Sequence, residues 1–146
     1  MNDLLNAPPP KRKIFVIDDH ITLRTGLVRI INNELDLTVC GEANTALEAM
    51  QSIGQLAPDL VMLETSLQDG DGVKLLQQIV LQWPKLAVLI LSMHDASTHA
   101  QRALRAGARG YVMKLEPAQD VLEGIRAVLA GRVHVSGARP SNDHTA

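Results

Sequence analysis

The sequence has few aromatic residues and almost no cysteine. Phenylalanine, tryptophan and tyrosine together make up 2% of its 146 residues, so a folded core must consist mainly of aliphatic side chains. Cys40 is the only cysteine, which excludes an internal disulfide and a zinc site built from several thiolates. Free cysteine is usually buried, so we expect Cys40 to pack as a small apolar side chain. Apolar residues still make up 46% of the chain, which suits a globular protein of one domain.

The sequence also lacks a strong charge of either sign and any long apolar run. Its net charge is −2, whereas a nucleic-acid-binding module normally carries a basic stripe. Residues 11–13, Lys-Arg-Lys, follow three prolines and no apolar stretch, so the N-terminus does not read as a signal peptide, and no run reaches membrane-spanning length. Phosphate-binding loops of the G-x-G-x-x-G or Walker type are also missing. We therefore expect a soluble, cytoplasmic protein without membrane contact.

Short apolar runs alternate with segments of helical periodicity. The runs predict strands at 14–17, 37–40, 58–64, 86–91 and 110–113. Apolar spacing and breakers predict helices at 23–31, 43–53, 73–83, 96–106 and 117–130. Five strands alternating with five helices imply an α/β domain with a parallel sheet covered on both faces. We expect a disordered leader at 1–12, the folded domain at 13–133 and a flexible tail at 134–146.

Several residues predict where the helices begin and end. Asp19 is expected to help satisfy the free amides of the first helix, and Asp95 those of the fourth. Gly54 is expected to stop the second helix and Gly107 the fourth. For the third helix, the predicted apolar face consists of Val73, Leu76, Val80 and Trp83. The apolar side of the fourth helix is nearly all alanine, so we expect this helix to be the most mobile.

Polar residues stand at the carboxyl ends of four predicted strands. Asp18 and Asp19 follow the first strand, Glu64 ends the third, Ser92 follows the fourth and Lys114 follows the fifth. In an open parallel sheet, ligands bind outside these ends, where the strand order reverses. Clustered carboxylates suit Mg²⁺, which prefers oxygen ligands and shares its coordination with phosphate. Together with a hydroxyl and an ammonium, they predict a site that holds a phosphoryl group on a carboxylate.

Plainer interpretations exist for each of these residues. Adjacent acids after a strand are often helix caps, and a lysine after a strand is often a solvated surface residue. Four such residues on different strands make the shared site the better interpretation. His94 and His99 are too far apart for a two-ligand helix face and are expected to be surface residues.

Five sequence segments carry a resemblance to a known family. They are Val16–His20, Pro58–Leu63, Asp71–Gly72, Leu91–Asp95 and Gly107–Lys114. From Ile14 to about Val133 the chain resembles a response-regulator receiver domain, and the Ser-Met-His-Asp and Gly-Ala-Arg-Gly-Tyr pieces are most similar to the LuxR-type (NarL/FixJ) subgroup. The resemblance implies a flavodoxin-like (βα)5 fold, with a five-stranded parallel sheet of order 2-1-3-4-5.

The resemblance also implies roles for individual residues in a two-component phosphorelay. Asp18 and Asp19, with Glu64 and the backbone of Ser66, would form a Mg²⁺ pocket. Ser92 and Lys114 would contact the phosphoryl group, and Tyr111 would be an aromatic switch that changes rotamer together with Ser92. The fourth helix, the fifth strand and the last helix would form the output face.

The chain departs from the family where the family has its phosphoacceptor aspartate. Glu64 occupies that position, and its side chain reaches roughly 1.5 Å further. Misplacement on the order of 1 Å can cost about a hundredfold in rate, so Glu64 is expected to be a poor acceptor. It either pairs with Lys114 and biases the domain toward an active-like state, or it disables the site and leaves a phosphorylation-independent interaction module. Gln68 stands where the family usually has proline, so the following loop is expected to be looser.

The expected function is therefore that of a response-regulator receiver, not an enzyme. Its implied partners are a sensor histidine kinase or another signalling protein, and a second copy of the chain through the output face. The subgroup usually continues into a DNA-reading helix-turn-helix domain, which this sequence lacks, so we expect a stand-alone or truncated receiver that binds no DNA itself. A Mg²⁺-dependent phosphatase or phosphotransferase using Asp18 as nucleophile is an alternative, although the Asp-x-Asp pattern is missing. A flavodoxin-like cofactor binder is disfavoured by the acidic first turn.

Overall fold

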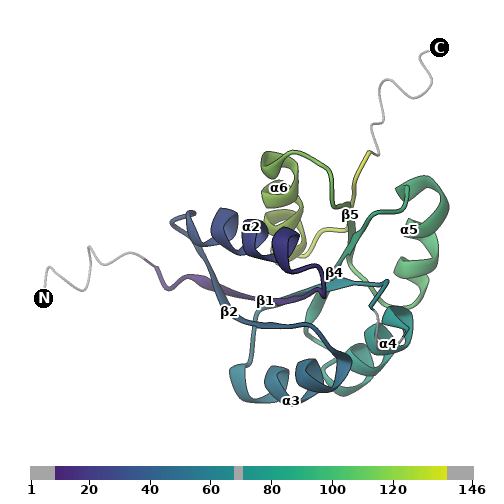
Figure 1. Ribbon diagram of the computed structural model, residues 1–146, viewed down its shortest axis with the longest axis horizontal. Coiled ribbons are helices and arrows are strands. Elements are labelled where there is room, and N and C mark those ends of the chain that lie inside the picture. The colour runs from purple at the N-terminus through teal and green to yellow at the C-terminus, as the bar shows by residue number, and fades with distance from the viewer. Residues whose placement is uncertain (1–8, 68–70, 138–146) are drawn as a thin grey trace, which may run out of the picture.

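The computed structural model describes residues 9–67 and 71–137, which form a parallel β-sheet between two layers of helices (Figure 1). The sheet order is β2-β1-β3-β4-β5-β6, so the expected order 2-1-3-4-5 is confirmed and extended by one strand. The strands are β1 (Arg12–Ile17), β2 (Leu37–Ala43), β3 (Leu60–Glu64), β4 (Ala87–Ser92), β5 (Gly110–Met113) and β6 (His134–Val135). The helices are α2 (Ile21–Asn32), α3 (Ala46–Leu56), α4 (Gly72–Gln82), α5 (Ala96–Arg105) and α6 (Ala118–Leu129).

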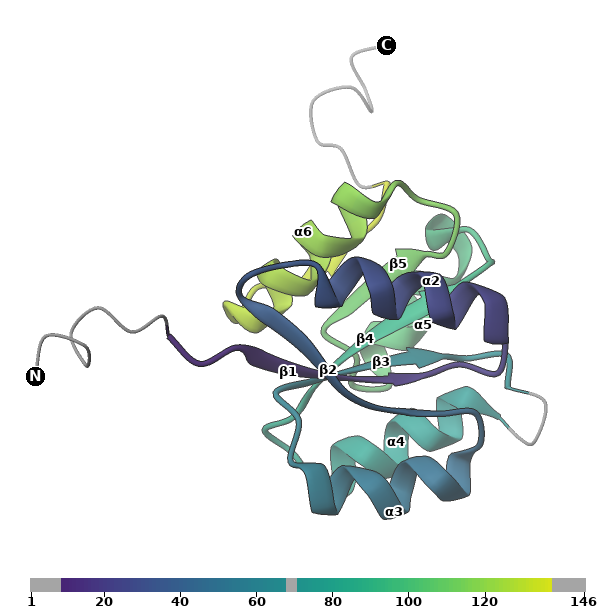
Figure 2. The ribbon, with the colours of Figure 1, turned by 60° about the vertical axis from the view of Figure 1, so that its left-hand side comes forward.

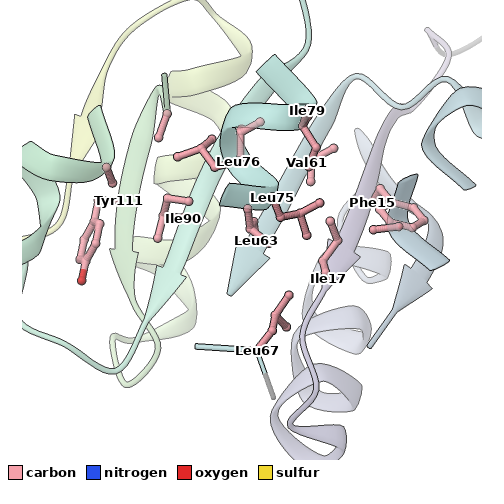
Figure 3. Close-up of a cluster of buried hydrophobic side chains, with 14 of the residues drawn as sticks. Phe15, Ile17, Val61, Leu63, Leu67, Leu75, Leu76, Ile79, Ile90 and Tyr111 are labelled. Atoms are coloured by element: carbon pink, nitrogen blue, oxygen red, sulfur yellow. The ribbon is translucent and has the colours of Figure 1, made fainter. Parts of the chain in front are cut away.

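The aliphatic core lies on both faces of the sheet. Helices α2 and α6 cover one face, and α3 and α4 lie on the other (Figure 2). The alanines of α5 join the core of the α3 and α4 face, which Figure 3 shows around Phe15, Leu63 and Leu76. Alternate residues along a strand point to opposite faces, which explains why Ile14 and Val16 belong to one core and Phe15 and Ile17 to the other.

The sixth strand corrects the expected boundary between domain and tail. His134–Val135 pair in parallel with Gly110 and Tyr111 of β5, and Ser136 is buried. The segment 134–137 therefore belongs to the folded domain rather than to a tail. Residues 1–8 of the predicted leader, the departure at Gln68 and residues 138–146 of the predicted tail lie outside the described residues.

The helices differ from the sequence predictions in three details. Helix α2 begins at Ile21, and the side chain of its N-cap residue, His20, makes no cap hydrogen bond, so the cap expected from Asp19 stays a prediction. Helix α3 runs past Gly54 to Leu56, whose carbonyl accepts a hydrogen bond from Lys13 Nζ at 2.7 Å. In α4, the expected residues Leu76, Val80 and Trp83 pack on the core. Leu75 and Ile79, which were not expected, are also buried.

The predictions for Asp95, Gly107 and Cys40 are confirmed. The Asp95 carboxylate accepts a hydrogen bond from the amide of Ser97 and caps α5. Gly107 follows α5 with a φ of 114°, a conformation that glycine adopts without steric cost. Cys40 is partly buried against the core, and this burial raises the pKa of its thiol. No helix among the described residues is long and apolar enough to cross a membrane.

Candidate functional site

A buried ion cluster lies at the carboxyl ends of β1, β3 and β5. Lys114 Nζ is 2.8 Å from Asp18 Oδ2 and 2.9 Å from Asp18 Oδ1. The same nitrogen is 2.6 Å from Glu64 Oε1. All three side chains are almost fully buried, with 3% of Lys114, 2% of Asp18 and 1% of Glu64 exposed. Buried charges need partners, so one ammonium between two carboxylates is the central feature of this site.

Glu64 is the last residue of β3, and the turn after the strand helps to position its side chain. Its Oε2 accepts a hydrogen bond from the amide of Ser66 at 2.8 Å. Its Oε1 is buried and has no well-directed hydrogen bond among the described residues, so its contact with the ammonium is held by charge. Gly72 packs directly on the backbone of Thr65, where a Cβ atom would lie 2.3 Å from Thr65 Cα. This close approach holds Thr65, the residue after Glu64, against the start of α4.

Asp18 is positioned by the turn between β1 and α2. Its Oδ1 accepts a hydrogen bond from the amide of His20 at 2.9 Å. Arg24, one turn into α2, donates from Nη1 to the Asp18 carbonyl at 2.7 Å and from Nε to Glu42 on β2 at 3.0 Å. Asp19 and His20 complete the turn, with His20 Nδ1 3.6 Å from Asp19 Oδ1. The acidic turn is thus fixed from both a helix and an edge strand.

Ser92 and Tyr111 lie on the neighbouring strands β4 and β5. Ser92 Oγ accepts a hydrogen bond from the amide of His94 at 3.0 Å, and its carbonyl accepts one from the amide of Lys114 at 2.8 Å. The Tyr111 hydroxyl donates to the His94 carbonyl at 3.0 Å, and burial raises the pKa of its phenol. Tyr111 also lines a pocket of about 300 Å³ with Thr65 and Ser66. The turn that begins α5 is therefore connected to both side chains.

The structure brings the predicted site residues to one end of the sheet. Asp18, Glu64 and Lys114 are in direct contact, and Asp19 lies in the same acidic turn. Ser92 is the last residue of β4, which pairs with β3. It follows Leu91, the residue of β4 that pairs with Glu64. His94 and His99 are exposed, as expected, and their rings stack with centroids 4.5 Å apart.

Sequence reasoning missed two residues of the site. His20 Nδ1 lies 2.8 Å from Lys114 Nζ and 3.1 Å from Asp18 Oδ1. Arg24 holds the acidic turn through its backbone carbonyl. The position of His20 directly after two aspartates was a usable signal for the first. For Arg24 the only signal was a single arginine one turn into the helix.

The donor set fits a divalent cation. Asp18, Asp19 and His20 each offer one ligand atom, and these atoms lie within 4.8 Å of one another. Carboxylates are the ligands that hard cations prefer, and the buried Oε1 of Glu64 contacts the same Lys114 ammonium as Asp18. The residues present can therefore hold a metal ion at the acidic turn.

Comparisons with known proteins identify the class. The response regulator receiver domain family matches residues 14–126, and the chain belongs to this family. A two-component response regulator of the LuxR family from Aurantimonas sp. SI85-9A1 has a similar structure, with a TM-score of 0.82 and 32% identity over 87% of this chain and 91% of that one. The receiver domain of NarL from Mycobacterium tuberculosis matches with a TM-score of 0.79 and 27% identity over 85% of this chain and 100% of that one.

Two proteins with similar sequences are longer than this chain and are named as regulators. The transcriptional activator DevR/DosR of Mycobacterium tuberculosis is 35% identical over 120 residues, which are 82% of this chain and 55% of that protein. The oxygen regulatory protein NreC of Staphylococcus aureus is 34% identical over 124 residues, 84% of this chain and 57% of that protein. This chain is thus a NarL/LuxR-type receiver domain that spans about half the length of these relatives.

Proposed function

We propose that this chain is a signalling receiver in which Glu64 stands at the phosphoacceptor position and accepts a phosphoryl group weakly or not at all. The observation that carries the proposal is the 2.6 Å contact between Glu64 Oε1 and Lys114 Nζ. The glutamate carboxylate sits on the ammonium that would otherwise bind an oxygen of the phosphoryl group. Pairing of this kind supports the hypothesis that Glu64 biases the domain toward an active-like state.

A divalent cation is part of the proposal. Asp18 and Asp19 would hold Mg²⁺, together with Glu64 and the backbone carbonyl of Ser66. When bound, the ion would neutralise charge on the phosphoryl oxygens. This chain fixes Asp18 in two ways: the amide of His20 donates to its carboxylate, and the guanidinium of Arg24 donates to its backbone carbonyl.

We propose that a structural change at the site is transmitted through the start of α5. Ser92 and Tyr111 both bond to His94, through its amide and its carbonyl respectively. A change in the position of Ser92 would therefore reach Tyr111 and the alanine-lined helix α5 through one residue. A pocket of about 300 Å³ is lined in part by Tyr111, and a second rotamer of the ring would enter it.

We further propose the partners of a receiver of this type. A sensor histidine kinase or another signalling protein would act on the domain, and a second copy could bind at the output face of α5, β5 and α6. DevR/DosR is described as a DNA-binding transcriptional activator, and in a full-length protein the receiver would regulate transcription. We assign no enzymatic activity to the chain.

The proposal is tested by incubating the protein with a small phosphodonor and Mg²⁺ and measuring its intact mass. Phosphorylation moves a phosphoryl group from the donor to a carboxylate oxygen and leaves an acyl phosphate. We expect no stable gain for the natural chain and a gain of one phosphoryl group for Glu64→Asp. A stable gain on Glu64 itself would overturn the proposal.

A matched variant separates mimicry from simple loss of the site. Glu64→Gln keeps the size of the side chain but removes the charge that pairs with Lys114. If Glu64 mimics the active state, Glu64→Gln changes amide exchange in α5 and at Tyr111. If Glu64 only disables the site, exchange in α5 stays as it is in the natural chain.

A further inference from the structure

The role inferred for His20 rests on the metal-holding role proposed above for Asp18 and Asp19. His20 follows these aspartates and directly precedes α2. Its amide bonds to Asp18 Oδ1, which turns the side chain back toward the acidic pair. Nδ1 then lies 3.1 Å from Asp18 Oδ1 and 3.6 Å from Asp19 Oδ1. The imidazole is half-exposed, with 49% of the side chain accessible, so solvent and ions can reach it.

Nδ1 is the ring nitrogen of His20 that faces the cluster. It lies 2.8 Å from Lys114 Nζ and 3.1 Å from Asp18 Oδ1. Ring nitrogens are the atoms through which histidine binds metals, so this orientation places a nitrogen ligand atom beside the two aspartates.

Four side-chain oxygen and nitrogen atoms surround this single cationic group. They are Asp18 Oδ1 and Oδ2, His20 Nδ1 and Glu64 Oε1, all between 2.6 and 2.9 Å from Lys114 Nζ. The arrangement shows that the pocket already accommodates a positive charge among nitrogen and oxygen ligands. Because Glu64 contacts the ammonium separately, it can retain Lys114 if a metal ion takes the acceptors on Asp18 and His20.

We propose that His20 is a ligand of this metal site and gives it a preference for transition-metal ions over Mg²⁺. Mg²⁺ prefers an all-oxygen shell and keeps several waters. Imidazole suits ions such as Ni²⁺ and Zn²⁺, whose affinity for mixed nitrogen and oxygen ligands is higher. Two carboxylates and one imidazole form such a mixed set, so the class of ligand is a divalent first-row transition metal.

Carboxylates alone also bind Ni²⁺ more tightly than Mg²⁺, so the change on removing the imidazole is the quantity to measure. The untagged 146-residue chain is titrated with Mg²⁺ and with Ni²⁺ by calorimetry, and compared with His20→Ala and His20→Gln. His20 supplies no side-chain cap to α2, so both variants should fold, and thermal unfolding checks this. We expect Ni²⁺ affinity to fall by at least about tenfold, the scale of loss seen even for outer-shell partners, and Mg²⁺ affinity to change much less.

A second readout detects the ligand itself, and a control excludes the stacked pair His94 and His99. With Mn²⁺ as the probe, pulsed electron paramagnetic resonance should show coupling to a ring nitrogen in the natural chain and not in His20→Ala. The double variant His94→Ala and His99→Ala removes the stacked surface pair and should keep both the coupling and the Ni²⁺ affinity.

The possible outcomes separate this inference from the proposed function. Equal Ni²⁺ affinity in the natural chain and His20→Ala, with Mg²⁺ bound by both, would overturn the role of His20 alone. Loss of Ni²⁺ binding in the His94 and His99 variant would do the same. If the folded natural chain bound neither ion, the metal pocket of the proposed function would fail as well.

Discussion

Helices α5 and α6 each follow a residue of the site, but they are fixed to the sheet in different ways. Helix α6 buries larger apolar side chains, among them Leu122, Ile125 and Val128, and follows the buried, ion-paired Lys114. Helix α5 buries only three alanines and follows Ser92. Burial of apolar area stabilises roughly in proportion to the area, so α6 is the firmly anchored half. We therefore expect Lys114 to stay fixed and the turn between Ser92 and α5 to be the more mobile of the two.

The largest expected loss of unfolding free energy comes from changing a site residue that precedes one of the two helices, Lys114 before α6 or Ser92 before α5. Lys114→Met leaves Asp18 and Glu64 buried without their cation, and breaking a buried ion pair costs about 3–5 kcal/mol of unfolding free energy. Ser92→Ala removes one acceptor from the amide of His94 and should cost only about 1 kcal/mol. Urea unfolding of both variants measures the difference. Mg²⁺ should reduce the loss in Lys114→Met, and equal losses in the two variants would break the comparison.

Substitutions of buried residues in the two helices should give the next largest loss of unfolding free energy. Ile125 is fully buried, and Ile125→Ala should cost about 2–5 kcal/mol because it leaves a cavity. Ala100 is the matched position in α5, where Ala100→Gly removes one methyl group and some helix propensity, at a cost of about 1 kcal/mol. Thermal unfolding of the pair tests this ranking, and a greater loss from Ala100→Gly would reverse it.

An ionic link between α6 and the start of β2 gives the smallest effect. Arg126 donates to both oxygens of Asp36, at 2.9 and 2.8 Å, and to Glu34 at 2.6 Å. These hydrogen bonds from Arg126 lower the pKa of Asp36 below its ordinary value of 3.8. A lowered pKa stabilises the fold at neutral pH, and this contribution is lost as the pH falls through the pKa of the folded state.

Arg126→Met should therefore raise the pKa of Asp36 toward its ordinary value. The stability change at neutral pH should be below about 1 kcal/mol, because the partners are largely exposed and screened by solvent. The variant and the natural chain should become equally stable in strong acid. A carboxyl-detected titration by nuclear magnetic resonance follows Asp36 directly, and an unchanged midpoint would contradict the link.

The fold and the central ion cluster were predictable because their signals are local. Each strand of the first five is a short apolar run, and each site residue stands where such a run ends. Strand β6 was missed because two residues, His134 and Val135, are too few to show a period, and their pairing depends on β5. Gly54 failed as a helix stop because Lys13 of a distant strand satisfies the carbonyl of Leu56. The burial of Leu75 and Ile79 in α4 was missed because apolar residues at adjacent positions fit more than one face of a helix.

The remaining details of the site depend on contacts between distant residues. That Glu64, Asp18 and Lys114 converge follows from topology, but that His20 turns its Nδ1 toward the same ammonium does not. Arg24 reaches the carbonyl of Asp18 only because α2 places it there.

Amide hydrogen exchange in α5 and α6, with and without phosphodonor and Mg²⁺, tests the central claim most directly. We predict that α5 exchanges faster than α6 in the natural chain, and that the phosphodonor changes neither helix. In Glu64→Asp the phosphodonor should change exchange in α5 and leave α6 protected. Equal protection of the two helices, or a response of the natural chain to the phosphodonor, would contradict the account.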